Sequence, residues 1–587
     1  MKPEAPLGLE LDIPSYGVRW AWFALLVIAI ASRLLRLGVP LLAPEEIARA
    51  LPSLDAARGA GWPVATDSPL LLVGNGFLFT IFAVTDGFAR LIPALAGVAL
   101  VALPLLWRKE IGDLGALVAA GLLIISPLTL FGSRRLAPAT PGVLTAGLIV
   151  TMLFRRGLDD EAHRRWLSAL FAGALGLGLV SGPSFFDLLL PGLFVGYVLN
   201  RSGRDRSGWI NWRLSLLAAA LIGTGISIAL GFRWSGWSGI ADGFAAWITS
   251  WGEQNVGSGA TGTLLLYEPL LLLTVLVGIG LLMRRQTEDD IYPWAILLWG
   301  IATLLVTALR SGDALSLGAA ALPLALFGGV AVQQLMDGLS TEDCKGGGLH
   351  ALAAFVFWLP GVLAMVQHAR GVLYEDQMML VLVGVIVLLA LQALLVFLFA
   401  MAVRLDVLWR SALTGFAAVV LILQASFAFG LGFVRADSPI EPAVASATSE
   451  DLRHLRSTLS DIGVLRNQRW DALPVAIIEE DAELAMLLRW VLRDFHRLAV
   501  VDLWPADPGA LVLTPEDVTL DRPPPGEGLR GMSFVASTTY NAPVPACQEL
   551  VPPACADFLR WYFYRASPYE VWRQSVILWQ AEAVSAH

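Results

Sequence analysis

The sequence predicts an all-α polytopic membrane protein with about 13 transmembrane helices and a C-terminal α/β domain outside the cytoplasm. Of its 587 residues, 56% are hydrophobic and only 15% are charged, and the mean hydropathy is +0.67. Soluble proteins average about 45–50% apolar and about 25% charged residues, so this chain is too apolar for a water-soluble globule. Its apolar residues gather in windows of bilayer length, whereas the last quarter has the composition of a soluble domain.

Windows of the length that a bilayer requires, roughly 20 apolar residues, recur from residue 20 onward. We expect the spans at 20–37, 91–107, 114–131, 141–154, 166–180, 183–199, 214–232, 264–283, 293–309, 315–332, 349–366, 378–403 and 412–434. The fourth and fifth windows are short for a bilayer. The first window follows acidic residues and lacks a small-residue cleavage site, so we expect a retained anchor and not a removable signal peptide.

Basic residues in the short loops predict the orientation, because cytoplasmic loops are enriched in Lys and Arg. Counted from a cytoplasmic N-terminus, every second loop is basic; the loop after the fourth span, for example, contains Arg155, Arg156, Arg164 and Arg165. The intervening loops are poorer in charge, and Arg233, Arg310 and Arg370 each occur singly in them. With an odd number of spans, the C-terminal domain lies outside the cytoplasm of a multi-pass cell-membrane protein.

The predicted transmembrane domain covers residues 1–434 and contains a first long loop at 38–90. Within that loop, the apolar stretch 69–84 is of marginal length and ends at Asp86, which favours an interfacial or re-entrant helix over a further span. The C-terminal domain covers 435–587. Its expected helices at 449–462 and 481–495 alternate with expected strands at 473–478, 498–503 and 510–513. This βαβ-like order predicts a small α/β domain.

The net charge of -9 and the three cysteines exclude several protein classes. A nucleic-acid binder would carry a basic surface, and a disulfide-stapled miniprotein would contain more cysteine. Cys547 and Cys555 both lie in the predicted outer domain, where an oxidising exterior would permit a disulfide; two unpaired thiols are the alternative. The six His residues show no metal-ligand spacing, so we expect no protein-bound metal site, and a divalent cation stays open as a cofactor.

Ionisable residues at the membrane edge are functional candidates, because placing a charge there costs several kcal/mol. The densest group surrounds the end of the first span, with Arg33 near that end and the adjacent acids Glu45 and Glu46 beyond it. Such a pair of carboxylates at the membrane surface could supply a general base. The alternative is structural, since Pro-Glu-Glu is also a helix-start pattern in which the acids face the positive end of the helix dipole.

Two arginines, Arg134 and Arg135, follow the third expected span on the outer side, against the positive-inside trend. A lipid phosphate or the acidic pair of the first long loop would compensate their charge. Ordinary headgroup contact by snorkelling is the alternative. Asp67 and the sequence around Arg90 form a third group, and turn chemistry explains most of it.

The order of these features resembles the membrane glycosyltransferases of the C-type fold, particularly protein O-mannosyltransferases and lipid A aminoarabinose transferases. In that family an uncleaved first span is followed by an acidic pair that opens the first outer loop, and a Ser-Arg follows the third span. The counterparts here are Arg33 and Arg36, Glu45-Glu46, 56–61, 68–70, Phe88-Ala89-Arg90-Leu91 with Pro93, and Ser133-Arg134. The resemblance covers roughly residues 1–200 well and the later spans in general plan.

The resemblance implies transfer of a sugar from a polyprenyl-phosphate carrier to an acceptor on the outer face of the membrane. Carried over by position, Glu45 would be the base and Glu46 its neighbour. The arginines carried over as lipid-phosphate ligands are Arg134, Arg135 and Arg33. Glu45 stands where the family usually has Asp, and the family's second acid is missing from 137–141. The alternative is a catalytically inactive relative that binds membrane lipid, or a protein partner through its outer domain.

Overall fold

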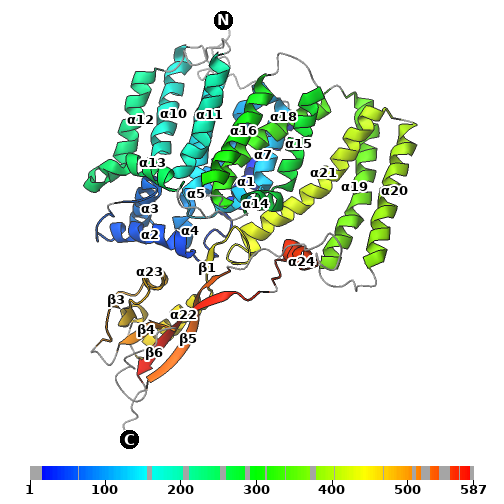
Figure 1. Ribbon diagram of the computed structural model, residues 1–587. Helices are drawn as coiled ribbons and strands as arrows, with labels where there is room; N and C mark the ends of the chain where they lie inside the picture. Colours follow the sequence, from blue (N-terminus) through cyan, green and yellow to red (C-terminus); the bar gives the residue numbers. More distant parts are fainter. Residues whose placement is uncertain are drawn as a thin grey trace.

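The computed structural model describes residues 16–63, 65–154, 161–201, 211–251, 259–284, 291–310, 314–337, 339–369, 378–401, 403–466, 469–505, 510–516, 529–540, 556–567 and 569–581. Its helices stand side by side as a bundle, and a sheet domain lies beneath one end of that bundle (Figure 1). Helices of the first long loop lie between these two parts, next to the helix α23 of the sheet domain.

The bundle and the first long loop contain the helices α1 to α21. Their bounds are α1 Tyr16–Leu34, α2 Pro44–Ala57, α3 Pro69–Ile81, α4 Asp86–Ala89, α5 Leu91–Ala102, α6 Arg108–Ile111, α7 Asp113–Ile125, α8 Pro127–Ser133, α9 Ala139–Phe154, α10 Glu161–Leu179, α11 Pro183–Arg201, α12 Trp212–Ser227, α13 Gly239–Thr249, α14 Gly259–Tyr267, α15 Pro269–Arg284, α16 Ile291–Arg310, α17 Ala314–Leu317, α18 Ala321–Met336, α19 Thr341–Ala369, α20 Met378–Ala400 and α21 Leu405–Phe429. A π-helical turn, Gly430–Val434, continues α21. The expected helix in the first long loop is present as α3, which begins at the N-cap Ser68.

The helical part is that of a polytopic membrane protein. Among the described residues, six helical segments are long and apolar enough to cross a membrane, or seven if one bent pair forms a single span. Shorter apolar helices such as α9, α11 and α15 lie at further expected windows. The total of about 13 spans and the side on which each terminus lies stay predictions.

The third expected span is not one continuous helix. It divides into α7 and α8, whose axes differ by 64°. The break has a local cause, because Pro127 opens α8 and has no backbone N–H to continue the ladder of α7. Ser126 caps the new helix, since its hydroxyl oxygen accepts a hydrogen bond from the backbone N–H of Thr129 at 3.2 Å. Arg134 follows directly after α8, and its guanidinium reaches the carbonyls at the end of α1.

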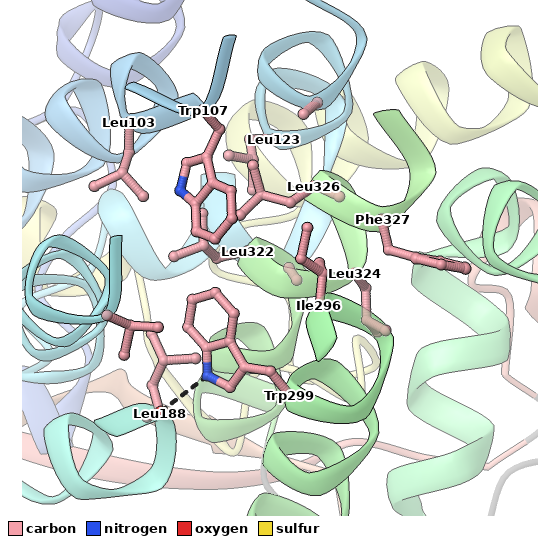
Figure 2. Close-up of a cluster of buried hydrophobic side chains, with 14 of the residues drawn as sticks. Leu103, Trp107, Leu123, Leu188, Ile296, Trp299, Leu322, Leu324, Leu326 and Phe327 are labelled. Carbon is pink, nitrogen blue, oxygen red and sulfur yellow. Dashed lines mark hydrogen bonds between the residues drawn. The ribbon is translucent and has the colours of Figure 1, made fainter. Parts of the chain in front are cut away.

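The core of the bundle combines large rings with closely approaching small residues. Trp107 and Trp299 stack with ring centroids 6.5 Å apart, and the indole N–H of Trp299 donates to the carbonyl of Leu188 (Figure 2). α7 and α18 meet at glycines, where a Cβ on Gly329 would lie 2.2 Å from the carbonyl oxygen of Gly115. Small residues that let backbones approach are a usual basis of helix packing in membranes.

The C-terminal domain contains a six-stranded mixed sheet in the order β1-β5-β6-β4-β2-β3. Its elements are β1 Ser446–Thr448, α22 Asp451–Leu465, β2 Val475–Ile478, α23 Ala482–Val491, β3 Leu498–Val501, β4 Leu511–Pro515, β5 Leu529–Thr539, α24 Ala556–Tyr564 and β6 Trp572–Ala581. β2 is parallel to both β3 and β4, which confirms the expected βαβ unit. β1, β5 and β6 pair antiparallel and were not expected. Cys547 and Cys555 lie outside the described residues.

The first long loop and the C-terminal domain share one hydrophobic core. Leu51 and Leu54 of α2 belong to the same buried cluster as Leu488 and Trp490 of α23. At the edge of this contact, the guanidinium of Arg489 lies 3.1 Å from the carboxylate of Asp55. The domain therefore packs on the loop, and α24 also returns to the bundle beside α19 (Figure 1).

Candidate functional site

The acidic pair lies in the first turn of α2. Pro44 starts the helix, and the Glu46 carboxylate accepts a hydrogen bond from the backbone N–H of Ala43 at 2.9 Å. Consecutive residues of an α-helix point about 100° apart, so only one of two adjacent side chains can face the same neighbour. Here Glu46 is 3% exposed and points into the protein, whereas the neighbouring Glu45 is exposed.

Glu46 is the centre of a buried ion cluster. Its oxygens accept hydrogen bonds from Arg90 Nε at 2.8 Å and Nη2 at 2.5 Å, and from Arg135 Nη1 at 2.8 Å. The backbone N–H of Leu136 donates to the same carboxylate at 2.6 Å. Burial desolvates the carboxylate and opposes its charge, but the two guanidinium charges outweigh this effect and hold the pKa of Glu46 below its ordinary value. Glu46 is therefore a permanently charged structural anchor.

Arg90 extends this cluster toward the end of α1. Its guanidinium also donates to the carbonyls of Leu37 at 3.1 Å, Pro40 at 2.8 Å and Leu41 at 3.0 Å. The connection between α1 and α2 is thus held by a residue that follows the short helix α4. Turn chemistry, the expected explanation, does not account for Arg90: the structure corrects it to a buried cation with acceptors on several segments.

The three arginine candidates for lipid-phosphate binding also donate to the protein itself. Arg134 donates to the carbonyls of Ser32 and Leu35 at 2.9 Å and Gly432 at 3.0 Å, and it lies over the ring of Phe433. Carbonyls at the end of α1 lack helical partners, so a guanidinium there acts as a cap.

Arg33, inside α1, donates to the carbonyl of Leu123 at 3.0 Å. Arg135 donates to the carbonyl of Ala436 besides Glu46. These contacts are structural, and lipid-phosphate binding by Arg33, Arg134 or Arg135 stays a prediction that the observed hydrogen bonds do not favour.

Glu45 opens into a cavity of about 380 Å³ that Arg49 and Asp67 also line. Arg49 Nε lies 2.9 Å from Asp67 Oδ2. The hydroxyl of Ser446, on β1, donates to Glu45 Oε1 at 3.3 Å. Burial of its surroundings raises the pKa of the Glu45 carboxyl, while the charge of Arg135 and the Ser446 hydroxyl partly offset that rise. The structure therefore brings Glu45 and Asp67 into one cavity and excludes Glu46 from it.

Two residues beside Glu45 were not assigned by the sequence reasoning: Arg49, which lines the cavity, and Ser446, whose hydroxyl donates to the Glu45 carboxylate. Arg49 lies one turn after Glu45 on α2, and the i, i+4 spacing was a visible signal for a shared face. Ser446 follows Glu45 by 401 positions, and no local pattern links the two. An exposed carboxylate with a raised pKa beside an arginine can accept a proton and stabilise a nearby anion. Among the described residues, no cluster of His, Cys, Asp or Glu could hold a metal ion.

Comparisons with known proteins agree with this architecture. No protein-family model and no curated protein sequence matches the chain. The crystal structure of ArnT from Cupriavidus metallidurans bound to undecaprenyl phosphate matches with a TM-score of 0.54 and 15% identity, covering 95% of this chain and 98% of that one. The chain therefore has the same fold as ArnT, over nearly the whole length of both chains.

The apo state of the same ArnT also matches, with a TM-score of 0.54, covering 96% of this chain and 98% of that one at 15% identity. The apo oligosaccharyltransferase of Archaeoglobus fulgidus has a TM-score of 0.48 and 12% identity, covering 83% of this chain and 64% of that one. At these identities the likeness concerns the fold, and activity has to be argued from the site itself.

Proposed function

We propose that this chain is a membrane glycosyltransferase that transfers a sugar from a polyprenyl-phosphate carrier to an acceptor on the outer face of the membrane. Glu45 is the general base in this proposal. The observation that carries it is the exposed Glu45 carboxylate, which opens into a cavity that Arg49 also lines. The fold adds support, because a similar protein, ArnT, was crystallised with undecaprenyl phosphate.

The proposed step is an inverting displacement. The Glu45 carboxylate accepts the proton of an acceptor hydroxyl while the acceptor oxygen forms a bond to the anomeric carbon. The bond between that carbon and the phosphate oxygen breaks, and the polyprenyl phosphate departs with the electron pair. The raised pKa of Glu45 suits a base that must hold a proton during the step.

The cation that meets the departing phosphate is Arg49 in this proposal. Arg49 lines the Glu45 cavity, and only its Nε is engaged by Asp67 at a short distance; its contacts with the carbonyls of Glu45 and Leu136 are 3.4 and 3.5 Å long. Long contacts are weak and can be exchanged for a phosphate oxygen. Arg134, by contrast, would have to release the carbonyls that end α1.

Release of polyprenyl phosphate tests the proposal. The purified full-length chain is incubated with a panel of polyprenyl-phosphate sugars, and the released lipid phosphate is measured for wild type, Glu45→Gln and Asp55→Asn. We expect Glu45→Gln to lower the rate by about 10²–10⁴-fold, the usual contribution of a general base. Asp55 is on the same helix and outside the cavity, so Asp55→Asn is the matched control and should keep the rate within about twofold.

Equal rates for wild type and Glu45→Gln would refute the assignment of the base. The second candidate is the inactive relative that binds lipid or a protein partner, and the hydrogen bonds of Arg134 to backbone carbonyls favour it. No release from any carrier in the panel, together with a partner that stays bound during purification, would support this second candidate over the transferase.

A further inference from the structure

A second cavity, of about 670 Å³, lies between the first long loop and the C-terminal domain. Asp86 and Gly87, at the start of α4, form one wall, and α22 forms the opposite wall. Arg493, just after α23, also lines it. None of its lining residues belongs to the cavity at Glu45, so the two spaces have separate walls.

The wall from α22 has a clear helical pattern. Leu452, Leu455 and Leu459 point into the core of the domain and are fully buried. A second face of the helix, next to these buried leucines, faces the cavity with Arg453, Arg456, Ser457 and Ser460. The spacing i, i+3, i+4, i+7 places these polar side chains on one face of the helix. The polar face of the amphipathic helix α22 therefore lines the cavity with guanidinium and hydroxyl groups.

The charge of the lining is positive. Three arginines and one acid, Asp86, line the cavity, a surplus of two positive charges in a chain whose net charge is -9. Asp86 is already engaged, because Arg493 Nη2 lies 3.3 Å from its carboxylate and the indole of Trp490 donates to it at 3.1 Å. The remaining nitrogens of Arg493 donate to the carbonyls of Val84 and Trp490. Arg493 therefore neutralises the one lining acid, and the two arginines of α22 are ion-paired with Glu450 and Asp494, acids that lie outside the lining.

The two arginines of α22 have guanidinium N–H groups that are available to a further acceptor. Arg453 is held by Glu450 and by the carbonyl of Val39, neither of which lines the cavity. Arg456 uses Nη2 for Asp494 at 2.5 Å, and within the described part of the chain its Nε and Nη1 have no hydrogen-bond partner. A guanidinium has five N–H donors, so Arg456 is positioned by one carboxylate and can bind a second anion.

We propose that this cavity binds an anion of the phosphate class, either a free phosphate or the phosphate of a lipid headgroup. Planar guanidinium groups donate paired hydrogen bonds to phosphate oxygens, and serine hydroxyls add further donors. Arg453 and Arg456 are the principal ligands, and Ser460 is the hydroxyl without a hydrogen bond in the described structure. The inference does not depend on sugar transfer at Glu45.

Calorimetric titration of the full-length chain in an uncharged detergent tests the site, with inorganic pyrophosphate as the probe. We expect wild type to bind and the double variant Arg453→Gln/Arg456→Gln to bind about tenfold or more weakly, because charge-assisted hydrogen bonds are lost. Arg573→Gln, an exposed arginine on β6 outside the cavity, is the matched control and should bind like wild type. The single variant Arg456→Lys keeps the charge but loses the paired donors, so it should bind more weakly than wild type and more tightly than the double variant, which separates binding from folding.

Thermal unfolding in phosphatidylcholine nanodiscs, with and without phosphatidylglycerol, identifies the source of the phosphate. If phosphatidylglycerol raises the Tm of wild type and not of the double variant, the ligand is a lipid headgroup. If only pyrophosphate does so, the ligand is a free phosphate. Failure of wild type to respond to either probe, or equal responses of wild type and the folded double variant, would overturn the proposal.

Discussion

Glu45 and Glu46 are consecutive residues of α2, yet they lie in two different regions of the molecule. Glu46 is in a closed cluster where Arg90 and Arg135 both donate to its carboxylate and compensate its charge. Glu45 opens into a cavity, and the side-chain hydrogen bond that its carboxylate accepts within the described part of the chain, from Ser446, is 3.3 Å long. Adjacent acids in one sequence motif can therefore have opposite roles, structural and chemical, according to the face of the helix that each occupies.

The contrast also shows what makes a charged residue available for chemistry. Buried ions must be paired and hydrogen-bonded, because an uncompensated charge in a low-dielectric interior is costly. Arg90, Arg134 and Arg135 meet this demand by donating to protein acceptors. Arg49 and Asp67 are each about a third exposed, so solvent already compensates them and a ligand can replace that solvent.

The largest expected loss of stability is in the closed region, by which we mean the buried ion cluster around Glu46; the open region is the cavity at Glu45. Glu46→Gln removes the charge that faces Arg90 and Arg135, and breaking a buried ion pair costs about 3–5 kcal/mol of the free energy of unfolding. Thermal unfolding of the full-length chain in detergent measures the loss as a drop in Tm. Glu45→Gln, the same change one residue earlier, is the control and should alter the free energy of unfolding by about 0.5 kcal/mol or less. Similar losses of unfolding free energy in both variants would contradict the assignment of a structural role to Glu46 and not to Glu45.

The next effect concerns the shape of the cation in the closed region. Arg90→Lys keeps the positive charge but loses the planar fork that reaches Glu46 and the carbonyl of Pro40 together. We expect a loss of about 2 kcal/mol in the free energy of unfolding, since several charge-assisted hydrogen bonds disappear. Arg489→Lys, in the half-exposed pair with Asp55, provides the comparison and should cost about 1 kcal/mol or less. A Tm for Arg90→Lys equal to that of wild type would show that the charge alone is sufficient.

The open region predicts a pH dependence. Partial desolvation of the carboxyl group raises the pKa of Glu45 although its side chain reaches the surface, and a general base acts only when it is deprotonated. Below that pKa, kcat/KM for sugar transfer should fall about tenfold per pH unit, and the fall should begin at a higher pH than for an ordinary Glu. The raised pKa stabilises the fold at low pH and loses this contribution as pH rises, so unfolding through Glu45 cannot cause the acid loss of activity. A pH profile without this acid limb would rule out Glu45 as the base.

The smallest effect on stability is expected in the open region. Arg49→Gln removes the Arg49–Asp67 pair, whose side chains are 32% and 36% exposed. Exposed ion pairs contribute about 0.2–1 kcal/mol, so Tm should change little while sugar transfer slows through the lost phosphate contact. A stability loss as large as that of Arg90→Lys would mean that the open region is as tightly coupled to the fold as the closed one.

Much of the secondary structure follows from local sequence. The apolar windows mark the helices, and the leucines of α22 at 452, 455 and 459 identify its buried face. The βαβ unit was visible because short apolar strands flank an amphipathic helix. β1 was missed because three residues are too few for an alternating pattern, and it pairs only where β5 is present. The break between α7 and α8 was missed because apolar composition extends across Pro127.

The sequence identified most residues of the candidate site, but it did not reveal the role of each residue. The acidic pair and the nearby arginines stood out because charge is scarce in an apolar chain. Their partners could not be read from the sequence, since Glu46 meets Arg90 and Arg135, which lie 44 and 89 positions away. The resemblance to C-type glycosyltransferases anticipated the fold, and the similarity to ArnT over 95% of the chain supports it.

The sequence by itself determined that this is a polytopic membrane protein with an α/β domain, because hydrophobic composition and period are local properties. It also determined that charge would gather at the first long loop. The tertiary structure alone decided that Glu46 is closed off by arginines and that Glu45 faces a cavity beside Ser446 of the other domain. The physical reason is that burial and pairing depend on which distant segments pack against each face of α2, and helical periodicity places a side chain on a face without choosing what covers it.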